Sequence, residues 1–278
     1  MSTLTLKEIQ NINTSGFEKI QFFPEAALQH IDEFASGLFN QTESPEPYHV
    51  SMLSDDIGYR KKAYYFLQQQ MAKYIAEILP EYEILCANFI VKPVHSGKFT
   101  LHQNWTFVDE IQSRSFTIWI PLTDCDEKNG TLFFLKGSHI GFRRILRGSG
   151  LPYFHSSYEE SIKQKCLPVN VRRGEAILLD DAIFHFSPNN QSNLPRVALQ
   201  FTCVKKETPT FHIALKKSWL FNSLYLTKTN AEWYISRNQN PSFSQRISYR
   251  LPKISEHSFW SILEQSPDLP VHLQKFVY

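Results

Sequence analysis

The sequence predicts a mainly β protein with flanking helices, built as a double-stranded β-helix of the jelly-roll or cupin-like kind. Short runs rich in β-branched and aromatic residues lie at 83–93, 98–105, 115–122, 130–135, 176–187 and 196–204. Turn-forming residues separate these runs, and no helical pattern alternates with them, which argues against an α/β fold. The residues before 82 instead carry apolar side chains at helical spacing.

The first 81 residues are predicted to be mainly helical. One helical pattern begins at Pro24, a residue suited to the first turn of a helix, and continues to Phe39. Its apolar positions include Leu28, Ile31 and Phe34. A second pattern covers 60–79 and ends at Pro80. We expect both helices to pack on the outside of the sheet, so that residues 1–81 form an N-terminal helical part on the barrel.

The remaining segments interrupt or follow a core predicted for residues 82–205. Residues 140–168 form a long aromatic and polar insertion, and a loop of this length is typical of a rim or lid over a pocket. Residues 206–278 are expected to be a C-terminal extension of the same domain. Between 205 and 253 the chain has nine Lys or Arg against two acids. This excess fits either a solvated surface or a funnel for an anionic substrate.

The composition is that of an ordinary globular protein. The 278 residues include 42% hydrophobic residues, and the formal net charge is +2, without a run of like charge that would indicate a nucleic-acid patch. The start lacks a signal-peptide pattern and no stretch has the length of a membrane span, so we expect a cytoplasmic protein without membrane or nucleic-acid partners. The four cysteines form no C-x-x-C pair and are expected to be buried free thiols.

Two short segments carry the chemistry. His102 and Asn104 are two residues apart in a predicted strand, so their side chains should leave the same face. His185 is followed by Ser187 at +2 and by Arg196 at +11. Two imidazoles from distant strands, with an arginine near the second, are the parts of a non-haem iron site that holds an anionic co-substrate. An arginine pointing into a barrel is costly unless it meets an anion such as a dicarboxylate. The loop between Ser187 and Arg196 predicts that their strands pair as a hairpin.

Five motifs in order give this region a family resemblance. They are VKPVHSGK at 91–98, LHQNW at 101–105, IWIPL at 118–122, KNGTLFFLKGSH at 128–139, and His185 with Ser187 and Arg196. The chain resembles the phytanoyl-CoA dioxygenase-like group of oxygenases, which depend on Fe(II) and 2-oxoglutarate and use dioxygen and a small-molecule substrate. The resemblance covers roughly residues 82–205.

The resemblance implies roles for individual residues. His102 and His185 match the iron-ligating histidines, and Asn104 stands at the position of the iron carboxylate. Arg196 and Ser187 match the clamp for the distal carboxylate of 2-oxoglutarate. Trp119 is expected either beside that clamp or in core packing, and Gln103 is expected at the substrate pocket. Turn or supporting roles are expected for the other polar residues near these motifs: Asp109, Glu110, His139, Asp180 and Asp181.

Asn104 departs from the family pattern because an amide carries no charge to offset a divalent cation. It could be an introduced change, a natural variant that still turns over, or the mark of a protein that only binds. Halogenases in related families leave this position small so that a halide can enter, whereas Asn104 fills the space. The sequence thus predicts an oxygenase that hydroxylates a C–H bond of a small polar or amino-acid-like metabolite. The alternatives are a non-catalytic binding protein, a halogenase-like or other non-hydroxylating variant, and a cupin-type isomerase or lyase.

Overall fold

The computed structural model describes residues 4–22, 25–39, 48–217, 222–236 and 244–265. Pro24, where the first predicted helix pattern begins, lies outside these residues. The helices are α1 (Leu6–Ser15), α2 (Glu25–Phe39), α3 (Ile57–Ile78), α4 (Ser138–Phe142), α5 (Glu159–Lys163), α6 (Ala231–Ser236) and α7 (Glu256–Gln265), with 3-10 turns η1 (Ser51–Leu53) and η2 (Ser156–Tyr158).

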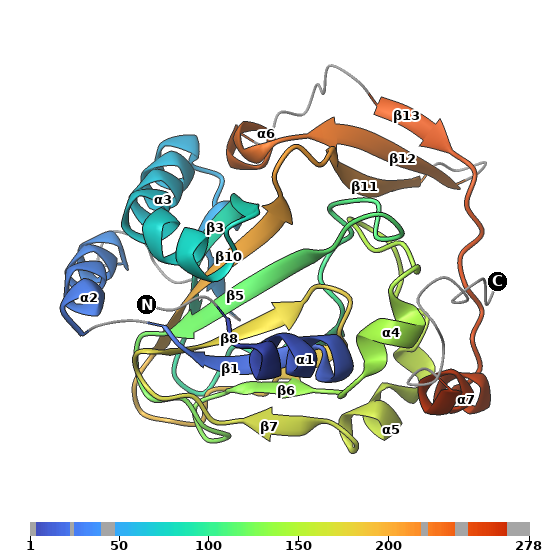
Figure 1. The fold of residues 1–278 in the computed structure, drawn as a ribbon, viewed down its shortest axis with the longest axis horizontal. Helices are drawn as coiled ribbons and strands as arrows, with labels where there is room; N and C mark the ends of the chain where they lie inside the picture. The colour runs from blue at the N-terminus through green and yellow to red at the C-terminus, as the bar shows by residue number, and fades with distance from the viewer. Residues whose placement is uncertain (1–3, 23–24, 40–47, 218–221, 237–243, 266–278) are drawn as a thin grey trace.

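Two antiparallel sheets face each other and form the core of the molecule (Figure 1). The larger sheet has the order β1 (Phe17–Gln21), β8 (Glu175–Asp180), β5 (Ser115–Pro121), β10 (Arg196–Lys205), β3 (Tyr82–Lys92), β2 (His49–Val50). The smaller has the order β4 (Phe99–His102), β9 (His185–Ser187), β6 (Leu132–Phe134), β7 (Leu167–Val169). Strands far apart in the chain lie side by side, as in a jelly roll. The predicted fold class is confirmed.

The N-terminal part covers one face of the larger sheet and also extends it. Helices α2 and α3 lie outside that sheet, and their fully buried Leu28 and Leu67 pack in one apolar cluster with Phe89 of β3 and Leu199 of β10 (Figure 1). This packing agrees with the expectation for the two helices. The same residues also supply β1 and β2 at the two edges of the sheet, which the helical pattern did not predict. Short edge strands such as these give weak sequence signals.

The predicted run 176–187 is two strands rather than one. Strand β8 ends at Asp180 in the larger sheet, and β9 begins at His185 in the smaller, so the intervening residues cross between the sheets. The predicted hairpin of the segments containing His185 and Arg196 is therefore wrong, since β9 pairs with β4 and β6 while β10 pairs with β3 and β5. A continuous apolar run has no periodicity that reports such a crossing.

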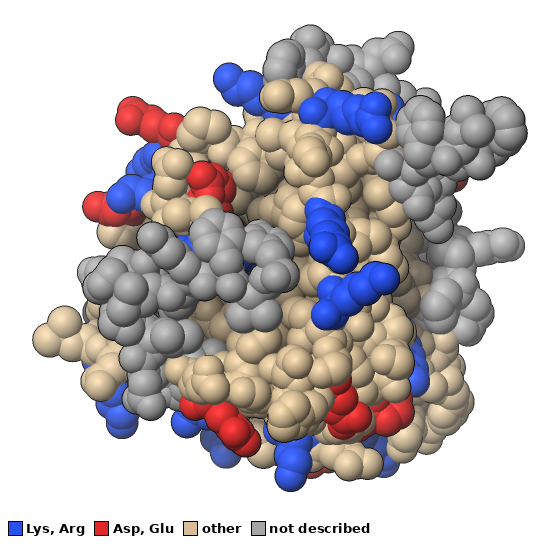
Figure 2. Space-filling view, turned by 90° about the vertical axis from the view of Figure 1, so that its right-hand side faces the viewer, with Lys and Arg blue, Asp and Glu red and all other residues tan. Residues whose placement is uncertain are grey.

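The C-terminal part forms a separate three-stranded sheet of β11 (Thr210–Lys217), β12 (Asn222–Thr229) and β13 (Ser244–Ile247). A hollow of about 720 Å³ beside it is lined by Arg246, Arg250 and Lys253 among other residues. Figure 2 shows this side of the molecule, with Lys and Arg near the centre and top and most acidic residues towards the lower edge and upper left. The division into parts at 81 and 205 stays a prediction.

All four cysteines are buried and free, as the sequence predicts. No helix in the described part of the chain has both the length and the apolar character needed to cross a membrane.

Candidate functional site

His102 and His185 lie directly opposite each other on the paired strands β4 and β9. Their ring centroids are 4.3 Å apart. Each Nδ1 lies within hydrogen-bond distance of the backbone carbonyl two residues earlier, 2.8 Å to Thr100 and 3.0 Å to Ile183. A carbonyl only accepts, so each Nδ1 carries the proton and each Nε2 keeps its lone pair. Burial lowers the pKa of both rings, that of His185 to about 3, which keeps both imidazoles neutral and able to bind a metal.

Asn104 lies beside these rings, although not for the predicted reason. Strand β4 ends at His102, so strict alternation along a strand does not orient Asn104. Its Nδ2 instead donates hydrogen bonds to Thr117 Oγ1 at 3.0 Å and to Asp181 Oδ1 at 2.8 Å. These contacts hold the side chain in the wall of the cavity that both histidines line.

This cavity lies between the two sheets and has a volume of about 80 Å³. The smaller sheet provides His102, His185 and Ser187, and the loop after β4 provides Asn104. The larger sheet provides Trp119 and Arg196. Apolar side chains complete its wall: Ile90, Phe99, Leu132, Leu179 and Phe186. Six of the seven predicted site residues therefore meet around one cavity, and Gln103 is the exception.

Arg196 provides a buried positive charge at this cavity. Its side chain is 2% exposed, and its Nε and Nη1 atoms have no hydrogen-bond partner in the part of the chain that the structure describes. The guanidinium lies over the ring of Trp119, 5.2 Å from the ring centroid, which orients it through a cation–π contact. A buried guanidinium with free N–H groups is costly and is suited to a carboxylate that binds both of them.

Lys92 is a second buried basic side chain, which the sequence analysis did not identify as a site residue. It lies opposite Arg196 in the pairing of β3 with β10, and its side chain is fully buried. Its Nζ donates to Ser187 Oγ and to the carbonyl of Pro188, while Ser187 Oγ donates to the carbonyl of Gly130 at 2.7 Å. Burial and then Arg196 lower the pKa of Lys92 to about 6. The sequence did contain a signal, a lysine that ends an otherwise apolar strand.

The donor set fits a mononuclear iron site with one weak ligand. Two neutral imidazole nitrogens and one amide oxygen can bind a divalent metal, and an oxygen and nitrogen set of this kind suits iron. Among the residues that the structure describes, no three His, Cys, Asp or Glu side chains are grouped so that they could hold a metal. Asn104 and Gln200 are the amide side chains among the described residues that line this cavity, and Asn104, two residues from His102, is the candidate for the third ligand.

Comparison with known proteins places the chain in a family. The family profile of phytanoyl-CoA dioxygenase (PhyH) matches residues 3–198. The chain belongs to the phytanoyl-CoA dioxygenase family. The phytanoyl-CoA dioxygenase domain-containing protein 1 of Bos taurus is 28% identical over 195 residues, which cover 67% of this chain and 66% of that protein. The protein of the same name from Danio rerio is 29% identical over 157 residues, 51% of this chain and 53% of the relative.

Solved structures share the fold at low sequence identity. HygX from Streptomyces hygroscopicus, crystallised with nickel and 2-oxoglutarate, has a TM-score of 0.53 and 15% identity, covering 74% of this chain and 88% of HygX. The non-heme alpha ketoglutarate dependent carbocyclase SnoK from nogalamycin biosynthesis has a TM-score of 0.57 and 14% identity, covering 74% of this chain and 86% of SnoK. The chain thus shares its fold with a protein crystallised with 2-oxoglutarate and with an alpha ketoglutarate dependent carbocyclase.

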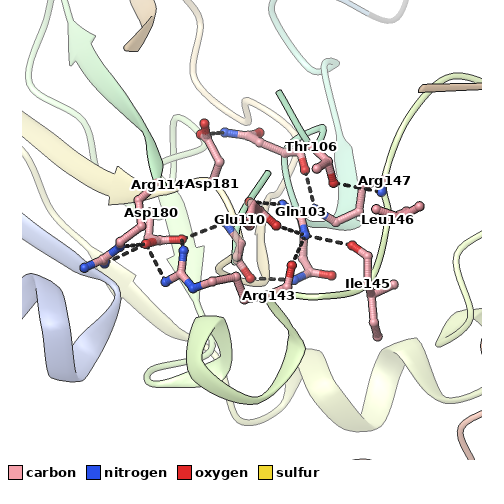
Figure 3. A network of polar contacts seen from close by, with 12 residues as sticks. Gln103, Thr106, Glu110, Arg114, Arg143, Ile145, Leu146, Arg147, Asp180 and Asp181 are labelled. Atoms are coloured by element: carbon pink, nitrogen blue, oxygen red, sulfur yellow. Dashed lines mark hydrogen bonds and ion pairs between the residues drawn. The ribbon is translucent and has the colours of Figure 1, made fainter. Parts of the chain in front are cut away.

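A network of polar and charged side chains supports the segment that follows His102 (Figure 3). Glu110 forms an ion pair with Arg147, with oxygen–nitrogen distances of 2.6 and 2.8 Å. Arg147 also donates through Nε to the backbone carbonyl of Asn104 at 2.7 Å. Burial raises the pKa of the Glu110 carboxyl, and Arg147 opposes this shift. Glu110 therefore has the supporting role that was expected of it.

The other polar residues near the family motifs also have structural contacts. Asp180 pairs with Arg114 and Arg143; burial alone would raise its pKa, but the two arginines lower it below its usual range. His139 Nε2 donates to the carbonyl of Asn13 at 3.1 Å. Asp109 accepts hydrogen bonds from the next turn, including the backbone N–H of Ile111. Asp181 is the exception, because it contacts Asn104 directly.

Gln103 faces a different cavity from the two histidines. Its Nε2 donates to the carbonyl of Ala182 at 2.5 Å. The residue lines a hollow of about 350 Å³ formed largely by the 140–168 insertion, and Trp105, Tyr153 and His155 lie in the same wall. His155 also contacts the strand that carries His102, since its Nε2 donates to the carbonyl of Leu101 at 3.1 Å. The insertion thus borders a hollow next to this strand, and its role as a rim or lid stays a prediction.

Proposed function

We propose that the chain is an Fe(II)- and 2-oxoglutarate-dependent oxygenase that hydroxylates a C–H bond of a small metabolite. One observation carries this proposal: two histidines with free Nε2 atoms share a cavity with a buried arginine that has unpaired N–H groups. A metal alone would not require the arginine, and an anion alone would not require the histidines. A chelating 2-oxo acid uses both.

The residues suggest how the co-substrate is held. Arg196 offers Nε and Nη1 to the distal carboxylate, and Lys92, which donates to Ser187, adds a second positive charge when it takes up a proton. Trp119 keeps the guanidinium in place by stacking against it. His102, His185 and the Oδ1 of Asn104 are the metal donors. HygX, with nickel and 2-oxoglutarate bound, supports this pairing of metal and co-substrate within the fold.

Iron and 2-oxoglutarate together supply the activation of dioxygen, with release of succinate and carbon dioxide. The task of this chain is to hold the reacting groups in position and to keep water out. The apolar side chains of Leu132, Leu179 and Phe186 line the cavity and limit its hydration. The larger hollow under the 140–168 insertion is our candidate for the substrate, because it borders the segment of His102 and Gln103.

Asn104 favours one alternative from another class, a non-catalytic binding protein on the same scaffold. A neutral ligand weakens the attraction for a divalent cation, and such a protein would hold a dicarboxylate at Arg196 without turnover. Non-hydroxylating oxidation is a further alternative in this fold, since SnoK is a carbocyclase.

Turnover of 2-oxoglutarate distinguishes these alternatives. Purified protein with Fe(II), ascorbate and a panel of metabolites should release succinate and consume dioxygen in equal amounts, and the product should gain one oxygen atom. The variant Arg196→Met should lose this activity at the same 2-oxoglutarate concentration. Binding of 2-oxoglutarate without succinate from any substrate would support the binding protein, and a product without added oxygen would support a non-hydroxylating enzyme.

A further inference from the structure

Asp181 is a buried carboxylate that forms no salt bridge within the described residues, although Arg143 attracts it at longer range. It lies between β8 and β9, where the chain crosses from the larger sheet to the smaller, and its side chain is fully buried. Its Oδ1 accepts hydrogen bonds from Asn104 Nδ2 at 2.8 Å and Thr117 Oγ1 at 2.6 Å. Its Oδ2 has no hydrogen-bond partner within the described residues, although the Ser115 hydroxyl also favours the ionised carboxyl. Burying a carboxylate in this way is unfavourable without an opposite charge nearby.

The preceding residue, Asp180, is equally buried but differs from Asp181 in its charged partners. Arg114 and Arg143 contact it at 2.6 and 2.7 Å. Figure 3 shows the two side chains in different surroundings, with both arginines at Asp180 and with an amide nitrogen at Asp181. Salt bridges to two arginines stabilise the buried charge of Asp180, whereas Asp181 forms no salt bridge with any residue that the structure describes.

The contact with Asp181 fixes the orientation of the Asn104 amide. An ionised carboxylate only accepts hydrogen bonds, so the atom of Asn104 that faces it must be Nδ2. Thr117 Oγ1 accepts from the same nitrogen at 3.0 Å. The amide nitrogen is therefore held behind the cavity wall, and no hydrogen bond within the described residues occupies Oδ1. That oxygen is left for the cavity that His102 and His185 line.

We propose that Asp181 is the positioning carboxylate of an amide-ligated metal site. It holds Asn104 Oδ1 ready for the metal, and it supplies from behind the negative charge that a ligating aspartate would supply directly. The inference rests on the proposed function, since it requires a divalent metal at these residues. Asn104 is then not a disabling change but one half of an Asn–Asp pair. In this pair the amide would bind the metal, and the negative charge would lie behind it on Asp181.

Cobalt(II) binding to the wild type and three variants tests the pair. Co(II) is spectroscopically visible, and its affinity can be measured under conditions without turnover. We expect Asp181→Asn to weaken Co(II) binding about 10- to 100-fold, the usual range for residues that support a ligand. Thr117→Val is the matched control: it removes a hydroxyl that contacts both residues but no charge, and its affinity loss should be much smaller. An unchanged Co(II) affinity in a folded Asp181→Asn variant would overturn the proposal.

The exchanged pair supplies a readout that a merely structural Asp181 would not change. Asn104→Asp alone places two carboxylates in contact, so the metal-free variant should melt below the wild type and recover when Co(II) is added. Asn104→Asp/Asp181→Asn should remove that penalty and bind Co(II) at least as tightly as the wild type. If the effects of the two changes on affinity were simply additive, the two residues would not be coupled and the proposal would fail.

The possible failures can be told apart. If Asp181→Asn does not fold, the melting temperature of metal-free Asn104→Asp decides the matter, because a value equal to that of the wild type contradicts the coupling of the two carboxylates. Wild-type protein that binds no Co(II) at all would overturn the proposed function and this inference with it. Tight binding by the wild type with unchanged binding by Asp181→Asn would overturn the inference alone.

Discussion

Lys92 and Arg196 face each other across neighbouring strands of the larger sheet, and both side chains are buried. Two positive charges so placed would repel each other, so Arg196 adds to burial in lowering the pKa of Lys92 and favours its neutral amine. The two residues lie at the end of the cavity where the proposed dicarboxylate binds. We infer that they form a preformed anion site, in which a bound carboxylate offsets the burial of the Arg196 charge and favours protonation of Lys92.

The first prediction concerns proton uptake. Burial and Arg196 lower the pKa of Lys92 to about 6, so the amine is mostly neutral at pH 7.5 without an anion. A bound carboxylate favours the charged form and raises that pKa, so 2-oxoglutarate binding should take up protons at pH 7.5 and tighten as the pH falls towards 6. Calorimetry of the Ni(II)-loaded protein in buffers of different ionisation enthalpy measures this uptake.

Lys92→Met should abolish most of the proton uptake and flatten the pH dependence of the affinity. Lys19→Met is a suitable control, because Lys19 lies in the same sheet but pairs with Glu175 and is partly exposed. Equal proton uptake by the wild type and Lys92→Met would show that another group titrates.

The second prediction concerns Arg196. Its removal should cost the pairing with the distal carboxylate, about 2 kcal/mol or more, or roughly a 30-fold loss of affinity for 2-oxoglutarate. The metal-free variant Arg196→Met should be no less stable than the wild type, because an unpaired buried charge is removed. Arg196→Lys should restore only part of the affinity, since it keeps the charge without the two-pronged contact. A large loss of stability with unchanged affinity would mean that the arginine is structural.

The third prediction concerns the Glu110–Arg147 ion pair, which contacts the backbone of Asn104. The side chains of Glu110 and Arg147 are 4% and 7% exposed, so breaking the pair should be strongly destabilising. Glu110→Gln should lower the free energy of unfolding by about 3–5 kcal/mol, measured by denaturant titration. The control Glu160→Gln removes an exposed carboxylate, one of the two that pair with Lys163, and should change stability by about 0.5 kcal/mol or less. Comparable losses in the two variants would contradict the buried role of the Glu110 pair.

The fourth prediction concerns the insertion pocket. Leu151 lines the hollow of about 350 Å³, so Leu151→Trp should reduce its free volume. We expect turnover of a true substrate to fall severalfold through a higher KM, while Ni(II) and 2-oxoglutarate bind as in the wild type. Leu167→Trp, at a leucine that is 56% exposed on β7, should change neither. A fall in 2-oxoglutarate affinity would instead indicate that the hollow belongs to the co-substrate.

The fold class and the meeting of the histidines with Arg196 could be predicted because both depend on strong local signals. The strands are rich in β-branched and aromatic residues, and the spacing of His185, Ser187 and Arg196 is characteristic of the family. Arg196 and Gln200, which are four residues apart on β10, both line the cavity, as the alternation of side chains along a strand requires. The family assignment is confirmed by the profile match.

Other features depend on contacts between distant parts of the chain. Nothing local in the sequence shows that Asp181 meets Asn104, because the two are 77 residues apart and neither lies in a strand. Lys92 is recognised as a site residue only when β3 and β10 are seen to pair. The three-stranded sheet after residue 206 likewise forms from short strands whose pattern alone did not reveal their partners.

An anaerobic titration of Fe(II) into protein with 2-oxoglutarate tests most directly whether His102, His185 and Arg196 hold one metal and one co-substrate together. Chelation of Fe(II) by the 2-oxo acid gives a visible metal-to-ligand absorption band. We expect a saturable band at one equivalent of Fe(II) that is lost in His185→Ala and requires a much higher 2-oxoglutarate concentration in Arg196→Met. Absence of the band at millimolar Fe(II), or a band of equal strength in all three proteins, would show that these residues do not hold the metal and the co-substrate together.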